Sequence, residues 1–70
     1  MSVDFSKNRI RELRIEHGLS QRALAEKTGI KQANISRWEA YSVIPNVLDC
    51  WVLSEFFSVS IDFLVGKKEY

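Results

Sequence analysis

Residues 20–39 read SQRALAEKTGIKQANISRWE, and this stretch determines the fold of the chain. The hydroxyl of Ser20 is suited to accept a hydrogen bond from the free amides at a helix start, so a helix is predicted over 21–28. Gly29 has no Cβ and therefore suits a sharp turn out of a helix. A second helix is predicted over 32–40. The pattern indicates two short helices joined by a tight turn.

The second predicted helix has two chemically distinct faces. Consecutive residues lie about 100° apart around a helix, which places Ile35 and Trp38 on an inward face. The opposite face carries the small or polar residues Gln32, Ala33, Ser36 and Arg37. Two short helices with such a turn form a helix-turn-helix. A polar outward face with a guanidinium has the chemistry needed to read base edges in the major groove of DNA.

Four segments of the chain resemble one known family. The segments QRALAEKTGI (21–30) and QANISRWE (32–39) resemble the lambda-repressor-like, Xre/Cro-type helix-turn-helix regulators, and so do RELRIEHGLSQ (11–21) and SEFFSVSIDFLVG (54–66). The resemblance covers roughly residues 7–66. It implies an all-α, five-helix bundle. It also implies sequence-specific binding to double-stranded DNA by a transcriptional regulator, acting as a repressor and as a homodimer on a palindromic operator.

Three further helices are predicted, and capping residues mark their starts. The ranges are about 7–17, 47–57 and 61–65. Asp4 or Ser6 caps the first, Asn46 caps the second and Ser60 caps the third. No segment alternates in polarity long enough for a pair of strands. We expect one domain over residues 1–70, with residues 67–70 as a flexible tail.

The composition fits a small globular protein. The chain has 70 residues, of which 46% are hydrophobic, so we expect a small core, modest stability and little disorder. Cys50 is the one cysteine, which excludes an internal disulfide. The sequence shows no signal peptide and no apolar run near the length of a membrane span. We therefore expect a cytoplasmic protein without a membrane partner.

Charge is divided unevenly along the sequence. Residues 1–37 carry eight Lys and Arg against four Asp and Glu, a net charge of +4, whereas residues 38–66 carry four acids and no base. A basic half suits a protein with one face toward phosphates. The alternative is an ordinary solvated surface on which the charges cluster by chance, and charge alone does not decide between the two.

The helix-turn-helix pattern gives four candidates for base contact, Gln32, Ala33, Ser36 and Arg37. A glutamine amide grips adenine N6 and N7, arginine suits guanine O6 and N7, and an alanine methyl suits the methyl of thymine. The hydroxyl of Ser36 lies between them and both donates and accepts. The alternative is a solvated polar face, so the prediction depends on the helix-turn-helix context.

Six further residues are candidates for phosphate contact. They are Gln21, Arg22, Lys31, Asn34, Tyr41 and Ser42. The resemblance implies a phosphate contact for Gln21, and helix starts attract anions in general. The alternative is that glutamine is simply a favourable residue in a first helical turn.

Two positions depart from the family pattern. Lys31 stands where relatives usually have a capping Ser or Thr, and lysine cannot accept a hydrogen bond, so we expect no side-chain cap there. Residues 40–43 read AYSV, whereas many relatives have a glycine and basic residues in this loop. The change removes positive charge beside the expected phosphate path, although the hydroxyls of Tyr41 and Ser42 are still able to bind a phosphate.

Four further residues, Arg14, Glu39, His17 and Cys50, are interpreted as structural. The resemblance implies a partly buried ion pair between Arg14 and Glu39, which would fix the recognition helix against the first helix. His17 lacks a second metal ligand at a suitable spacing, and Cys50 is interpreted as a core residue. We expect no metal, no cofactor, no small-molecule substrate and no catalytic activity.

The fourth predicted helix has more apolar residues than one inward face holds. We expect the inward arc to consist of Val47, Cys50, Trp51, Leu53, Ser54 and Phe57. This leaves an outer stripe of Leu48, Val52 and Phe56, and such a stripe favours a partner. Together with Ile44 and Ile61 it is our predicted homodimer interface. The alternative is a set of scattered exposed hydrophobic residues, which are common.

A second function stays open at this point. The same fold with an apolar fourth helix and a neutral loop would also suit a protein-interaction module, comparable to an antitoxin or to the target of an anti-repressor, with weak DNA binding. Binding to random duplex DNA at low salt discriminates between the two, because phosphate contacts make affinity fall steeply with salt.

Overall fold

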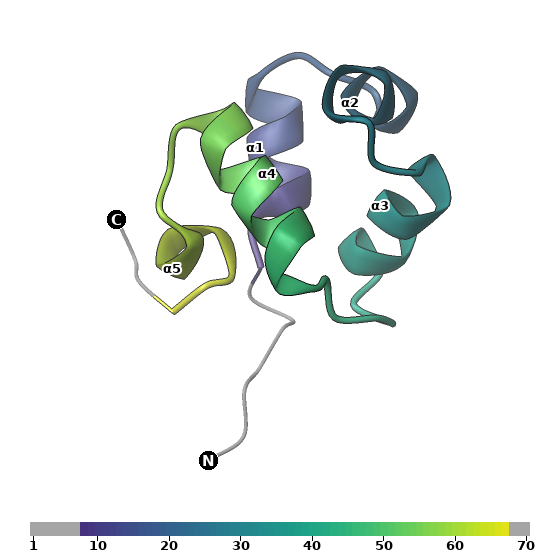
Figure 1. Cartoon of the computed structure of the whole chain (residues 1–70). Helices are drawn as coiled ribbons and strands as arrows, with labels where there is room; N and C mark the ends of the chain where they lie inside the picture. Colours follow the sequence, from purple (N-terminus) through teal and green to yellow (C-terminus); the bar gives the residue numbers. More distant parts are fainter. Residues whose placement is uncertain (1–7, 68–70) are drawn as a thin grey trace.

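The computed structural model describes residues 8–67, and the bundle they form is all-α (Figure 1). The five helices are α1 (Ile10–Glu16), α2 (Gln21–Thr28), α3 (Gln32–Glu39), α4 (Val47–Phe57) and α5 (Ile61–Leu64). No strand occurs within these residues, so the predicted fold class is confirmed. Nor does any helix in this range have the length and apolar character needed to cross a membrane.

Local chemistry explains the boundaries of α2 and α3. Ser20 Oγ accepts from Ala23 N at 3.0 Å at the start of α2. Gly29 ends that helix at φ 76°, a left-handed conformation that favours glycine. Thr28 Oγ1 donates to the Leu24 carbonyl and accepts from Ile30 N, which closes the turn. Lys31 is the N-cap of α3 without a side-chain bond, as predicted.

The core draws side chains from every helix. Its buried members are Ile10, Leu13, Leu24, Ile30, Ile35, Trp38, Cys50, Leu53, Phe57 and Leu64. In Figure 1, α4 crosses in front of α1, with α2 and α3 on one side and α5 on the other. Burial of these apolar groups is the main favourable contribution to stability. The arrangement leaves one long side of α3 facing away from the bundle.

The first helix starts later than predicted, at Ile10 instead of residue 7. The reason is tertiary. The backbone N–H of Arg9 donates to the Leu64 carbonyl at 2.8 Å, and Asn8 donates to the Trp38 carbonyl and accepts from Ile10 N. These bonds to α3 and α5 require a non-helical path before Ile10. The predicted caps Asp4 and Ser6 lie outside the described residues.

The inward face of α4 is narrower than predicted. Cys50, Leu53, Ser54 and Phe57 are buried, but Val47 is 80% exposed and Trp51 is 58% exposed, so their assignment to the inward arc was wrong. Val52 and Phe56 were expected on a free outer stripe, but both are only partly exposed and pack against the core. Because α4 is apolar on nearly all sides, its residue periodicity does not define which side is buried.

Candidate nucleic-acid interface

The outward face of α3 is polar and free of internal bonds. The side chains of Gln32, Ser36 and Arg37 are exposed, as is Ala33. None of the three polar side chains has a hydrogen bond or ion pair with another residue in the range 8–67. Eight helical residues span about 12 Å, so this face is long enough to reach a few base pairs. Its amide, hydroxyl and guanidinium are therefore available to an external partner.

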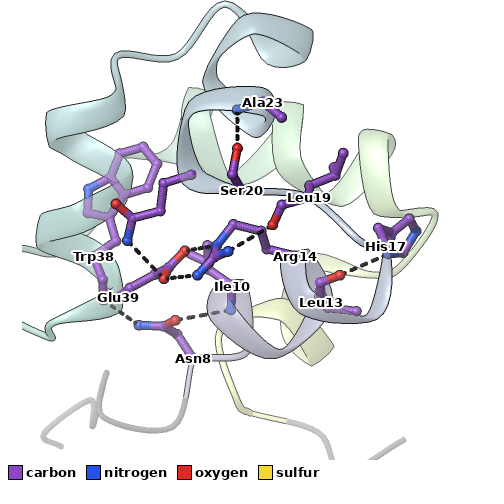
Figure 2. Close-up of polar contacts among 11 residues, drawn as sticks. Asn8, Ile10, Leu13, Arg14, His17, Leu19, Ser20, Ala23, Trp38 and Glu39 are labelled. Atoms are coloured by element: carbon purple, nitrogen blue, oxygen red, sulfur yellow. Dashed lines mark hydrogen bonds and ion pairs between the residues drawn. The ribbon is translucent and has the colours of Figure 1, made fainter.

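Behind this face, α3 is tied to α1 by the Arg14–Glu39 ion pair (Figure 2). Arg14 Nε donates to Glu39 Oε2 at 2.7 Å, and Arg14 Nη2 donates to Glu39 Oε1 at 2.9 Å. The side chains of Arg14 and Glu39 are 13% and 5% exposed. Arg14 Nη1 also donates to the Leu19 carbonyl at 2.8 Å, which holds the turn between α1 and α2. A bidentate pair of this kind fixes orientation as well as distance.

The environment of Arg14 keeps its guanidinium charged. The hydrogen bond to Glu39 raises the pKa of Arg14, and the charge of Glu39 acts in the same direction against the opposing effect of burial. Removal of either partner would leave the other buried without compensation, and such losses are large. The pair therefore fixes the orientation of α3 relative to α1.

Gln21 connects α2 to the same network. Its Nε2 donates to Glu39 Oε1 at 3.1 Å, an interaction that the sequence did not predict. The amide nitrogen has a second hydrogen, which is still able to donate to a phosphate. The Glu39 carboxylate of α3 thus accepts hydrogen bonds from Arg14 of α1 and from Gln21 of α2.

The other phosphate candidates differ in how free they are. Arg22 forms an exposed i,i+4 pair with Glu26 at 3.2 Å, and such pairs are weak and easily exchanged. Lys31 is exposed and Asn34 is half-buried, and neither side chain has a hydrogen bond or ion pair within the part of the chain that the structure describes. These residues frame the start of α3, beside the face described above.

The loop after α3 is less suited to phosphate binding than its two hydroxyls suggest. Ser42 Oγ donates to the Arg37 carbonyl at 3.1 Å, so its proton is already used. Tyr41 is exposed and has φ 60°, a left-handed conformation that is costly for an aromatic residue. Tyr41 therefore occupies a backbone position that suits glycine. Of the two hydroxyls in this loop, that of Tyr41 is the one without a hydrogen bond within residues 8–67.

A family model described as Helix-turn-helix matches residues 10–64, which includes all five helices. The chain belongs to this family, the lambda-repressor-like helix-turn-helix regulators. No solved structure gives a significant match.

Curated relatives of this helix-turn-helix domain carry regulator names. The HTH-type transcriptional activator BcrR of Enterococcus faecalis is 36% identical over 61 residues, which is 87% of this chain and 30% of the relative. The Uncharacterized HTH-type transcriptional regulator YobD and the HTH-type transcriptional regulator ImmR, both of Bacillus subtilis (strain 168), have the same identity over 61 residues and are covered to 54% and 48%. The chain thus spans between about a third and about a half of these relatives.

The helix-turn-helix domain has two supporting residues that the sequence analysis missed. Asn8 is buried and bridges the start of α1 to the end of α3. Arg9 lies with its guanidinium carbon 4.2 Å from the centre of the Phe63 ring and donates to the Phe63 carbonyl. Sequence periodicity gives no signal for either residue, because both act on helices that are distant along the chain.

The predicted dimer residues of the domain do not form one exposed stripe. Ile44 is 59% exposed, Leu48 is 64% exposed and Ile61 is 37% exposed, whereas Val52 and Phe56 contribute mainly to the packing against the core. Phe56 also stacks edge-on against Phe57, with the ring centres 5.2 Å apart. The exposed members of the set therefore lie in the loop before α4, on the first turn of that helix and at the start of α5.

Cys50 and His17 contribute to the packing of α4 and α1. Cys50 is buried, and burial, followed by the charge of Asp49, raises the pKa of its thiol. His17 packs edge-on against Phe57 at 4.9 Å between ring centres, and its Nδ1 contacts the Leu13 carbonyl. Within residues 8–67 no three His, Cys, Asp or Glu residues are grouped as metal ligands would be.

Proposed function

We propose that this domain regulates transcription by binding double-stranded DNA with α3 in the major groove. The observation that carries the proposal is the free polar face of α3. Gln32, Ser36 and Arg37 have no side-chain partner among residues 8–67, while the opposite side of the same helix is fixed by burial and by Glu39. Side chains that are unpaired on a rigidly held helix are ready to bond base edges without first breaking other contacts.

Phosphate contacts complete the proposed complex. We assign Gln21, Arg22, Lys31, Asn34 and Tyr41 to the backbone of the DNA, with Ser42 as a secondary contact. These residues lie on α2, at the start of α3 and in the loop that follows, so they flank the four base-contacting candidates. Phosphate contacts set register and orientation, and the base contacts provide sequence preference.

We further propose that the domain acts as a homodimer on a two-fold symmetric operator and represses by occupying it. A single α3 reaches few base pairs, and the loop after it lacks the positive charge found in many relatives. A two-fold axis doubles the contacts and places the recognition helices about 34 Å apart, one turn of DNA. Ile44, Leu48 and Ile61, with Val52 at the edge, supply the contact between copies.

The test is selection of bound sites from random duplex DNA, followed by a salt titration of the selected site. We expect a palindromic consensus and a linear fall of log K with log salt, with a slope of about 0.9 per phosphate neutralised. A reporter gene under the selected site then reads the direction of regulation, and repression is the expected result. Absence of binding to any duplex at low salt would refute the DNA-binding assignment and support the interaction module.

The dimer is tested separately by Ile44→Lys, with Val52→Lys as a second variant. We expect sedimentation to show weak self-association, with a Kd in the micromolar-to-millimolar range, because the interface is small. Ile44→Lys should abolish this association, and operator DNA should strengthen it. Val52→Lys should reduce it less, because Val52 is partly covered by its own domain. A strict monomer that binds an isolated half-site as tightly as the palindrome would contradict the dimer.

A further inference from the structure

The residue that follows α3 has a backbone conformation that its side chain disfavours. Within residues 8–67 the chain enters the left-handed region after each of the five helices, at Gly18, Gly29, Tyr41, Ser58 and Gly66. A residue with a Cβ atom is disfavoured in that region. Three of the five positions are glycine, whereas Tyr41, at φ 60°, is a bulky aromatic residue. The end of α3 is therefore strained.

Hydrogen bonds of the backbone impose this conformation on Tyr41. Tyr41 N donates to the Trp38 carbonyl at 3.0 Å, and Ser42 N donates to the Arg37 carbonyl at 3.0 Å. Such a pair of bonds closes the last turn of a helix and requires a left-handed residue at its end. Glycine would form the same two bonds without the steric conflict of a Cβ atom. The strain therefore comes from the type of residue and not from the turn.

The side chain of Tyr41 makes no compensating polar or aromatic contact inside the domain. It is 52% exposed and does not belong to the core. Neither its hydroxyl nor its ring has a hydrogen bond, ion pair or ring contact with any residue from 8 to 67. Strained backbone positions are concentrated at functional sites. The exposed phenol is therefore suited to an external partner.

The position of Tyr41 favours DNA as that partner. Tyr41 lies in the loop between α3 and α4, two residues after α3 ends (Figure 1). Both the amide and the hydroxyl of Ser42 are bonded to the Arg37 carbonyl, so the loop is held against the last turn of the helix that carries the base-contacting candidates. Residues 40–46 contain no Lys or Arg. A phosphate beside this loop therefore has the phenol of Tyr41 as a neutral donor.

We propose that Tyr41 raises the affinity of the domain for DNA while it lowers the stability of the fold. Its hydroxyl donates to a phosphate oxygen beside the C-terminal end of α3, and its ring lies against the adjoining sugar. The inference rests on the proposed DNA-binding function. It adds that the strain is tolerated because glycine, which would remove it, offers no side chain to the DNA.

Tyr41→Gly separates the two effects, because it removes the strain and the phenol together. We expect the equilibrium constant for unfolding, measured by urea denaturation, to fall by about threefold or more. The affinity for the selected operator, and for an isolated half-site of it, should fall by about tenfold. The variant should thus be more stable than the parent chain and should bind DNA more weakly.

Ser58→Gly is the matched control. Ser58 is exposed and ends α4 at φ 57°, so this substitution removes the same kind of strain at a helix end away from α3. We expect a similar decrease in the equilibrium constant for unfolding. The affinity for DNA should stay within about twofold of that of the parent chain.

Tyr41→Phe tests the hydroxyl alone, because it keeps the strained backbone and the ring. We expect the equilibrium constant for unfolding to stay within about twofold of the parent value, with weaker binding to the operator. A scan of the operator with single uncharged methylphosphonates locates the contact. At one position the substitution should weaken binding of the parent chain and leave binding of Tyr41→Phe unchanged.

Three outcomes, in a parent chain that binds the operator, would overturn the proposal. The first is Tyr41→Gly binding as tightly as the parent chain. The second is a loss with the palindrome but not with the half-site, which would make Tyr41 a contact between copies. The third is a Tyr41→Gly variant no more stable than the parent chain. A parent chain that binds no duplex would instead refute the DNA-binding function itself, so the two failures are distinguishable.

Discussion

α3 and α4 each present one long side to solvent, and the two sides have opposite chemistry. On α3 the exposed side chains are an amide, a hydroxyl and a guanidinium, and on α4 they are an isobutyl group, an indole and a carboxylate. Polar groups lose little by staying in water and gain when a base edge replaces it. Exposure of apolar groups to water is unfavourable, and this free-energy cost is removed when another surface covers them. The exposed side of α3 is therefore suited to polar contacts, and the exposed side of α4 to apolar ones.

The buried sides of the two helices also differ. α3 is held by Ile35 and Trp38 together with the carboxylate of Glu39, which receives hydrogen bonds from both Arg14 and Gln21. α4 is held almost entirely by apolar side chains. Directional bonds define one orientation, whereas apolar burial is non-directional. A helix that must present side chains to base edges at fixed positions benefits from the first kind of attachment.

The largest effect is expected from Glu39→Ala, which removes the directional attachment of α3. It leaves Arg14 buried without its counter-charge, and we expect a loss of about 3–5 kcal/mol in the free energy of unfolding. Urea denaturation followed by circular dichroism measures it. Glu26→Ala, which removes one partner of an exposed pair, is the matched control and should cost no more than about 1 kcal/mol. Equal losses in the two variants would show that the buried pair does not anchor α3.

The attachment of α4 is tested by Leu53→Ala. Leu53 is fully buried, so its truncation removes apolar contacts and leaves a cavity, with an expected loss of about 2–5 kcal/mol. Trp51→Ala, on the exposed side of the same helix, should change stability by only about 0.5 kcal/mol. A larger loss of stability in Trp51→Ala than in Leu53→Ala would contradict the assignment of the buried and exposed sides of α4.

The contrast between the outer sides is tested by Arg37→Ala and Gln32→Ala. Each should reduce the affinity for the selected operator by about 1–3 kcal/mol and relax preference at one base pair. Stability should stay unchanged, because neither side chain has a partner within the described residues 8–67. Competition between operator and random DNA is the measurement. Undiminished discrimination in both variants would remove these residues from base readout.

The smallest effect concerns the Cys50 thiol on the buried side of α4. Its pKa is raised in the folded protein, so the folded state keeps the proton at a pH where the unfolded chain has lost it. The contribution to stability is complete below the unfolded pKa of about 8.5. It then falls as pH rises, by less than about 1.4 kcal/mol per pH unit. Urea midpoints measured across this range should fall in the parent chain, and the fall should be smaller in Cys50→Ala.

Sequence reasoning performed best where the information is local. The span of α2 was predicted as it occurs, and α3 ends at Glu39, one residue before the predicted end. α2 is bounded by a capping serine, Ser20, and by Gly29 in the left-handed conformation, and α3 has a two-faced residue pattern. These signals act within a few positions. The Ser60 cap of α5 and the Asn46 cap of α4 were confirmed for the same reason.

Sequence reasoning failed where the deciding contacts join distant residues. α1 begins late because Asn8 and Arg9 bond to Trp38 and Leu64, and no neighbouring residue signals these bonds. The buried side of α4 was predicted too wide, because apolar residues occur on nearly all sides of this helix. The packing of the other helices decides that Leu53 enters the core and that Trp51 does not. The exposed polar side of α3, by contrast, was accessible from the sequence, since its two faces differ in residue type.

The bond from Arg9 N to the Leu64 carbonyl has a consequence for the connectivity of the chain. A 2.8 Å hydrogen bond places the residue before the first helix against the last residue of the fifth, so the path of the backbone is nearly a closed ring. A short Gly/Ser linker from residue 67 back to residue 8 would close it, and new termini could then be opened beside exposed Gly18. Such a circular permutant would keep α2, α3 and their turn in one unbroken segment. It would move both ends of the chain to the corner between α1 and α2.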